Sequence, residues 1–212
     1  MQIHNVEQNT HEWDLARAGV ATASQMSDLF TATHAVPKKV TKVMLEFAAS
    51  LASDKFSGLP LSADEYFQGN AATRRAHELE PVAFNDYNFR YNGDMQKVGF
   101  VTNGGVGCSP DGLGLVEGGL EMKCFLSKKH TRCVLQCIEG ICPPEEYVQI
   151  QACMWICERE WWDLYLYHPH LACMRFRVVA DPDFWVKLDL QCAAIIYERN
   201  IMLDALKSAE NM

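Results

Sequence analysis

The chain has 212 residues, enough for one sizeable domain that buries a core without covalent cross-links. It is 49% apolar, yet it has no uninterrupted apolar stretch long enough to span a bilayer, and its first residues lack the charged-then-apolar pattern of a secretion signal. The formal net charge of −8 argues against a surface broadly adapted to nucleic acid, although it leaves room for a local basic channel. We expect a soluble cytoplasmic protein in which residues 1–212 form a single domain.

Cysteine usage indicates a reducing compartment. The nine cysteines are an odd number in a chain that is not short, and several lie within apolar helical or strand patterns. Free buried thiols therefore explain them better than a disulfide framework. Cys133, Cys137 and Cys142 are loosely spaced and contain no C-x-x-C, which does not favour an iron–sulfur cluster.

Three helices are predicted in the first half of the chain. Thr22 and Gln25 have capping-box spacing at the start of a short helix over residues 22–30. A second helix is expected over residues 41–52, with one apolar side. A third is expected over residues 65–85, where a proline at position 81 should bend or interrupt it.

The second half alternates predicted strands with helices. Strands are expected over residues 98–102, 120–125, 162–167 and 174–179, and helices over residues 143–157, beginning at two prolines, and 181–207. This order predicts a single domain of the α/β or α+β class. No internal repeat or linker is evident.

The strand over residues 120–125 carries the first chemical signal. Apolar and charged residues alternate there with the period of two that a half-buried strand requires. Glu121 and Lys123 should therefore share one face, while Leu120, Met122 and Cys124 point into a core. A carboxylate and an ammonium are then presented together from a rigid platform.

A second carboxylate precedes this strand at hairpin distance. Asp111 belongs to an S-P-D-G turn, and the glycines that follow can return the chain beside itself. Asp111 and Glu121 should converge as ligands of Mg²⁺, with the backbone carbonyl of Met122 completing the protein's share. Lys123 would then orient or help to deprotonate a water, as in a metal-dependent phosphodiesterase. The alternative is an exposed hairpin whose Glu121 and Lys123 form a solvated pair.

Positive charge gathers at three places. Any one of the clusters can be a solvated face, but the last follows the proposed metal site directly and is interpreted as a surface that tracks phosphates. The clusters are Lys38, Lys39 and Lys42; Arg74 and Arg75; and Lys123, Lys128, Lys129 and Arg132.

Four motifs in a fixed order resemble those of the lambda exonuclease (YqaJ-type viral recombinase) family, within the PD-(D/E)xK nuclease superfamily. They are W-x-x-x-R-x-G-x-x-T-A-S at residues 13–24, a G-x-x-x-E-P helix at residues 76–81, S-P-D-G with E-M-K at residues 109–123, and Q-x-Q-x-x-M-W at residues 149–155. Ala76 departs from the second motif, where the family usually has glycine. The resemblance is strongest over residues 13–155. It implies the restriction-endonuclease-like fold, an α/β domain with a central mixed sheet flanked by helices.

The resemblance also implies site roles. Asp111, Glu121 and the Met122 carbonyl would bind Mg²⁺, for which Mn²⁺ could substitute, and Lys123 would activate water. Glu80 would lie near a second metal or hold a metal-bound water. Its alternative is an exposed helix carboxylate before a proline.

A pocket for a 5′ phosphate is implied as well. It would consist of Arg17, Ser24, Ser109 and Gln149, because an arginine fork suits phosphate oxygens and a serine at a helix start offers a hydroxyl. Gln149 would also position the attacking water. Without the resemblance, Arg17 is a surface ion-pair partner and Ser24 a helix cap.

The activity implied by the resemblance is a Mg²⁺-dependent 5′→3′ exonuclease. It would degrade one strand of double-stranded DNA processively from its ends and leave 3′ overhangs for a single-strand annealing protein, in a bacterial, phage or prophage context. A ring-shaped homotrimer, carried over by analogy, would need basic residues only in its channel. Two alternatives stay open: a sequence- or structure-specific DNA endonuclease on the same fold, and a DNA-binding recombination protein whose acidic residues are structural. Lys38, Lys39 and residues 59–67 are loose candidates for splitting the duplex.

Overall fold

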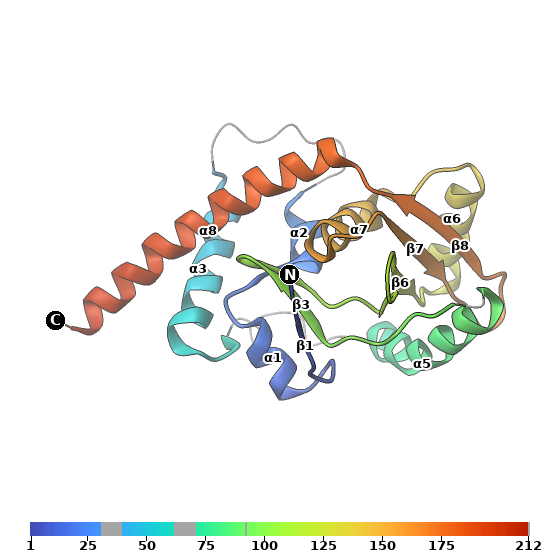
Figure 1. Ribbon diagram of the computed structural model, residues 1–212, viewed down its shortest axis with the longest axis horizontal. Coiled ribbons are helices and arrows are strands. Elements are labelled where there is room, and N and C mark those ends of the chain that lie inside the picture. Colours follow the sequence, from blue (N-terminus) through green and yellow to red (C-terminus); the bar gives the residue numbers. More distant parts are fainter. Residues whose placement is uncertain (31–39, 62–70, 92, 212) are drawn as a thin grey trace.

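The computed structural model describes residues 1–30, 40–61, 71–91 and 93–211 (Figure 1). The strands are β1 (Gln2–His4), β2 (Ala21–Thr22), β3 (Phe100–Asn103), β4 (Val106–Cys108), β5 (Gly112–Leu113), β6 (Gly119–Lys123), β7 (Trp161–Leu166) and β8 (Met174–Val179). The helices are α1 (His11–Arg17), α2 (Ala23–Leu29), α3 (Lys42–Ser57), α5 (Ala71–Tyr91), α6 (Ser127–Ile138), α7 (Pro144–Cys157) and α8 (Pro182–Glu210).

The strands form two mixed sheets of four strands each. In the first, with order β1-β3-β4-β2, only the β2–β4 pair is parallel. In the second, with order β5-β6-β7-β8, only the β6–β7 pair is parallel. The predicted α/β class with mixed pairing and flanking helices is confirmed. The strands are divided between two sheets, however, where one central sheet was expected.

Strand β6 has the two faces that its alternation predicts. Leu120, Met122 and Cys124 are buried against α5 in a small apolar cluster. Since Glu121 is in register with Leu164 of β7, it shares the opposite face, where Leu164 belongs to the main core that includes α7. The acidic and basic residues of β6 are therefore directed toward α7.

Helix α7 is apolar on nearly every side, because it contacts both sheets as well as α2 and α8. Val148, Ile150 and Met154 are buried in the main core. A helix so enclosed is a rigid support for the few polar side chains that it carries. The predicted start at the paired prolines and the predicted end at Cys157 are both confirmed.

Other predicted helices agree with the structure, with local differences. Gln25 Oε1 accepts a hydrogen bond from the backbone N–H of Thr22, as the capping box requires. Met44, Phe47 and Leu51 form the buried apolar side of α3, whereas Val43 on the same helix is 57% exposed. Helix α5 continues through Pro81 to Tyr91, so the predicted interruption is not found. The expected beginning of this helix, residues 65–70, lies outside the described residues.

Helix α8 is the longest element and packs along α3 before extending beyond the rest of the chain (Figure 1). Arg199 on α8 is buried and donates a hydrogen bond to the carbonyl oxygen of Gly19 at 2.9 Å. This contact links the carboxyl-terminal helix to the segment between α1 and β2. Among the described residues, no helix is long and apolar enough to cross a membrane.

All nine cysteines are free, and seven of them are buried. Cys108 of β4 and Cys157 of α7 approach each other with their sulfur atoms 3.4 Å apart. Cys133 and Cys137 lie in the main core, and Cys142 packs against it. The cysteines thus serve as core residues of modest size.

Candidate active site

The hairpin that joins Asp111 to Glu121 forms as predicted. Strand β5 pairs antiparallel with β6, with Gly112 opposite Leu120. Asp111 Oδ2 accepts a hydrogen bond of 2.6 Å from the backbone N–H of Met122, which fixes this carboxylate beside β6. Asp111 immediately precedes β5, and Glu121 is the residue before Met122 in β6, so the two predicted metal ligands lie close together.

Lys123 and Gln149 complete a hydrogen-bonded group around Glu121. Lys123 Nζ lies 2.8 Å from Glu121 Oε1 and 3.1 Å from Gln149 Oε1. Gln149 Nε2 donates to Glu121 Oε1 at 2.9 Å. Glu121 is buried, and the Lys123 side chain is only 20% exposed. The three side chains are thus held together by direct contacts, and a solvated surface pair is not what the structure shows.

Most of the predicted site residues line one cavity of about 240 Å³. It brings residues of α1, α2, α5 and α7 together with Asp111 and Glu121 on the second sheet. The lining residues are Gln8, Asn9, Trp13, Arg17, Ala23, Ser24, His77, Glu80, Ser109, Asp111, Glu121, Gln149 and Cys153. A neighbouring cavity of about 340 Å³ shares Asp111 and Glu80 and is lined also by Met122 and Lys97.

One wall of the smaller cavity is suited to an anion. Arg17 lies over the ring of Trp13, with its Cζ 3.8 Å from the ring centroid, and its Nη1 is 3.5 Å from Ser109 Oγ. Trp13 Nε1 donates to the same Ser109 Oγ at 2.8 Å. Burial lowers the pKa of Arg17 to about 10, so the guanidinium is still charged at neutral pH. Among the described residues Arg17 has no carboxylate within ion-pair distance. A partly buried cation that forms no ion pair with a described carboxylate favours an anionic ligand.

Ser24 and Glu80 lie at the edge of this arrangement. Ser24 is exposed, and its Oγ is 3.3 Å from Thr22 Oγ1. Glu80 is 37% exposed and lies 3.3 Å from His77 Nδ1. Ser24 and Glu80 both line the cavity with the other predicted site residues. Their side-chain contacts, however, are local: Ser24 contacts the N-cap residue of its own helix, and Glu80 contacts a residue one turn earlier on α5.

Electrostatics of the buried carboxylates favour a cation. Burial raises the pKa of Asp111 well above its ordinary value, and the charge of Glu121 adds to this effect. Burial also raises the pKa of Glu121, although Lys123 opposes the shift. Burial opposes the charge on Lys123, yet Glu121 and Glu146 outweigh it and raise the pKa of its ammonium group. A divalent ion would relieve the cost of bringing Asp111 and Glu121 together.

The donor set fits Mg²⁺, which is usually held by one or two carboxylates together with waters and substrate phosphate oxygens. Asp111, Glu121 and the carbonyl of Met122 supply that inventory. In the described part of the chain, no three His, Cys, Asp or Glu side chains converge on a possible metal position. Glu80 lines both cavities together with Asp111, and its part in holding a metal, directly or through water, stays a prediction.

Several lining residues were not assigned a role from the sequence. Gln8 bridges two backbone carbonyls, with Nε2 at 2.8 Å from Val98 O and 2.9 Å from Pro110 O. Trp13 and His77 lie within two of the four family motifs, so their position in the sequence already indicated that they could be near the site. Nothing in the sequence indicates that the segment around Gln8 reaches the site, because this depends on the long-range pairing of β1 with β3.

The three predicted clusters of basic residues differ in the contacts that their side chains make. Lys38 and Lys39 lie outside the described residues, as does most of the stretch over residues 59–67. Arg75 donates to the carbonyl oxygen of Cys124 at 3.1 Å, beyond the end of β6. Arg132 pairs with Glu145 at 2.7 Å on the surface, so part of the last cluster is already neutralised.

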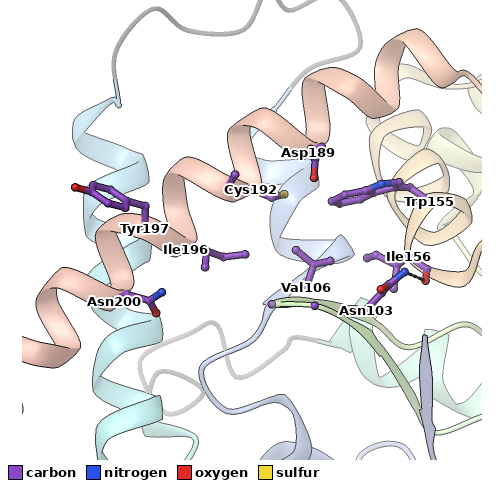
Figure 2. A pocket seen from close by; sticks show the side chains of 12 residues that line it. Asn103, Val106, Trp155, Ile156, Asp189, Cys192, Ile196, Tyr197 and Asn200 are labelled. Carbon is purple, nitrogen blue, oxygen red and sulfur yellow. Dashed lines mark hydrogen bonds between the residues drawn. The ribbon is translucent and has the colours of Figure 1, made fainter.

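A larger cavity of about 590 Å³ lies elsewhere, between α8, the end of α7 and the β3–β4 turn (Figure 2). Figure 2 shows Ile196 and Tyr197 of α8 on one side and Val106 and Trp155 on the others. None of the predicted site residues lines it. Its walls are mostly apolar, and they carry no group of catalytic side chains.

The sequence and the structure were compared with known families and solved structures. The sequence pattern of the YqaJ-like viral recombinase domain matches residues 12–160. The chain belongs to this family. In three dimensions the protein is similar to an alkaline exonuclease (LHK-Exo) from Laribacter hongkongensis, with 27% identity, a TM-score of 0.77, and coverage of 95% of this chain and 98% of the other. The same exonuclease in complex with dAMP matches at 26% identity and a TM-score of 0.77, covering 96% and 100% of the two chains.

A phage-related exonuclease from Haemophilus somnus 129PT shares the fold, with 12% identity, a TM-score of 0.62, and coverage of 96% of this chain and 97% of the other. No curated protein matches the chain. The predicted family is confirmed, and the structural neighbours have the PD-(D/E)xK type of fold. Family and likeness together support a DNA exonuclease, while the roles of individual residues stay predictions.

Proposed function

We propose that the protein is a Mg²⁺-dependent exonuclease that degrades one strand of double-stranded DNA in the 5′→3′ direction. The observation that carries this proposal is the shared cavity: the partly buried Arg17 and the carboxylates of Asp111 and Glu121 line the same space of about 240 Å³. Such a cavity joins an anion-binding wall to a hydrolytic centre.

The residues divide the chemistry between them. Asp111, Glu121 and the carbonyl of Met122 would hold Mg²⁺, which when bound offsets charge on the phosphate and lowers the pKa of a water. Gln149 and Lys123, both in contact with Glu121, would orient that water for attack on phosphorus. Lys123 is charged in this environment, so its ammonium would stabilise negative charge that develops in the transition state.

Recognition of the end would come from Arg17 together with Ser109, Ser24 and Gln149. The complex of the related LHK-Exo with dAMP supports a subsite for a nucleoside monophosphate.

This arrangement predicts processive movement. Water adds to the phosphorus of the first internucleotide linkage, and the bond to the 3′ oxygen breaks. The leaving oxygen takes up a proton and departs as the 3′ hydroxyl of a mononucleotide, while the shortened strand keeps a new 5′ phosphate. That phosphate can enter the Arg17 pocket, so the reaction can repeat on the same strand.

Assembly and partners follow from the family as part of the proposal. A homotrimeric ring would enclose the duplex and restrict basic surface to its channel, which accords with the net charge of −8. The 3′ overhangs would be bound by a single-strand annealing protein, as expected for a recombinase family.

The test compares linear duplex DNA with covalently closed circular DNA. We expect Mg²⁺-dependent release of mononucleotides from the linear form and an intact circle. Cleavage of the circle would favour an endonuclease on the same fold, and no metal-dependent release from either form would favour a DNA-binding recombination protein. Lys123→Ala should abolish hydrolysis while DNA ends still bind; cleavage at the wild-type rate by this variant would refute the site.

A further inference from the structure

Glu146, in the first turn of α7, makes contacts that the proposed site does not yet explain. It is only 4% exposed. Its Oε2 lies 3.1 Å from Lys123 Nζ, and its Oε1 lies 3.3 Å from Lys129 Nζ. A carboxylate so deeply buried is costly to desolvate, and it is retained where it binds cations directly. Here it binds the lysine of the proposed catalytic centre.

The contacts of Lys123 show what Glu146 adds. The ammonium group of Lys123 forms ion pairs with Glu121 and Glu146 and donates a hydrogen bond to Gln149 Oε1, so three acceptor side chains surround it. Glu121 is a proposed metal ligand, and Gln149 is a proposed ligand of the attacking water. Glu146 has neither of these tasks, so its carboxylate can hold the ammonium group while the other two acceptors act on metal and water.

Glu146 is itself held firmly in place. Its backbone N–H donates to the carbonyl oxygen of Pro143 at 2.9 Å in the first turn of α7. Its second oxygen is engaged by Lys129, whose Nζ lies 3.9 Å from the centroid of the Phe125 ring. Gln149 follows Glu146 by three positions, so both side chains project from the same face of the helix toward β6.

We propose that Glu146 is a positioning residue that holds the ammonium group of Lys123 against Glu121 and Gln149 for the hydrolytic step. The inference rests on the proposed function, since it assigns Glu146 to that same reaction. Glu146 does not line the cavity that receives the DNA end. Its loss should therefore slow the chemical step and leave end binding unchanged.

The experiment uses the full chain and measures single-turnover release of the first nucleotide from a 5′-phosphorylated duplex at saturating Mg²⁺. Glu146→Gln keeps the size of the side chain and removes its charge. Glu145→Gln is the matched control, because Glu145 is the preceding residue, is half exposed and pairs with Arg132 on the surface. Thermal unfolding, duplex-end affinity and the half-saturating Mg²⁺ concentration are measured for each variant.

We expect Glu146→Gln to lower the single-turnover rate by on the order of 10-fold or more, because Lys123 loses an ion pair, with duplex-end affinity and the half-saturating Mg²⁺ concentration within about twofold of wild type. Loss of the two buried ion pairs should lower the melting temperature, and the rate is therefore measured at a temperature where the variant is folded. Glu145→Gln should match wild type throughout. A rate for Glu146→Gln within twofold of this control would overturn the inference. So would a loss of rate that is accompanied by an equal loss of end affinity in the folded variant, because that result indicates a purely structural role.

If Glu146→Gln does not fold, Glu146→Asp answers the same question. The shorter side chain keeps the charge but withdraws the carboxylate from Lys123, so the rate should fall while affinity stays constant; an unchanged rate would overturn the inference. Wild-type protein serves as the reference for the function itself. If it releases no nucleotide with metal, the proposed function fails, whereas an active wild type with an unaffected Glu146→Gln variant contradicts the positioning role alone.

Discussion

Replacing Arg17 with alanine should remove the preference for 5′-phosphorylated DNA ends. The guanidinium stacks on the ring of Trp13, and its contact with Ser109 Oγ is long, at 3.5 Å, so its N–H groups are available to phosphate oxygens. A hydrogen bond to a charged group contributes about 1.5 to 3 kcal/mol. Wild-type protein should therefore prefer a phosphorylated end over a hydroxyl end by about 10-fold to about 150-fold, and Arg17→Ala should prefer neither.

The preference should also depend on pH in a defined direction. Burial lowers the pKa of Arg17 to about 10, and an arginine carries its charge below its pKa. The preference should thus be complete up to roughly pH 9 and decline as pH rises through about 10. Arg17→Lys keeps a charge but lacks the planar fork, so it should recover only part of the preference.

The assay is competition between duplexes that differ only in the 5′ phosphate, followed by the initial rate of nucleotide release from each. Arg132→Ala is the control, since it removes one positive charge from a surface pair and should weaken both substrates equally. If Arg17→Ala still discriminates between the two ends as wild type does, the phosphate pocket is wrongly assigned.

Three further predictions concern stability. Burial and the charge of Glu121 raise the pKa of Asp111, so its carboxyl group in the native protein keeps a proton that the unfolded chain loses above about pH 4. Metal-free protein should therefore lose stability as pH rises, and Asp111→Asn should melt at a higher temperature than wild type at pH 7 but not at pH 3. Equal melting temperatures of the two proteins at both pH values would contradict the raised pKa. Asp163 is 0% exposed and accepts two hydrogen bonds from Arg177. Asp163→Ala should therefore lower the free energy of unfolding, measured by chemical denaturation, by about 3 to 5 kcal/mol. A decrease below about 1 kcal/mol would show that this ion pair contributes little to stability. Gly19 has a φ of +71°, and an added Cβ would lie 2.6 Å from Cβ of Lys55 on α3. Gly19→Ala should therefore lower the free energy of unfolding by at least about 1 kcal/mol. An unchanged midpoint of denaturation would contradict this prediction.

The part of the site that the sequence predicts well depends on local geometry. Alternation along β6 separates Glu121 and Lys123 from Met122, and a glycine-rich hairpin can bring Asp111 back beside them whatever the rest of the fold does. The paired prolines define where α7 begins, so Gln149 could be placed on a helix. These features follow from strand period, turn chemistry and helix capping, which act over a few residues.

The remainder depends on contacts between distant segments. Strand β2 is only two residues long and exists because it pairs with β4, so the division of the strands into two sheets has no local signal. The convergence of Gln8 with the site has the same origin. Helix α5 passes Pro81 without a break, and burial of Ala83 and Tyr87 against β6 beyond that point offsets the lost hydrogen bond.

Glu146 illustrates a signal that was present in the sequence but not decisive. Its position three residues before Gln149 puts the two on one face of a helix. A glutamate in the first helical turn is also favoured by the helix dipole, which explains it without any role in catalysis. Only the distance of 3.1 Å to Lys123 Nζ and the burial of the carboxylate distinguish the two interpretations.

Digestion of a linear duplex that carries a radioactive phosphate at one 5′ end tests the proposed polarity and metal requirement together. We predict that the labelled phosphate is released first, as a mononucleotide, and only when Mg²⁺ is present. The account would be contradicted if the label stayed on strands that shorten from their 3′ ends, appeared first in fragments cut internally, or were released equally well in the presence of a metal chelator.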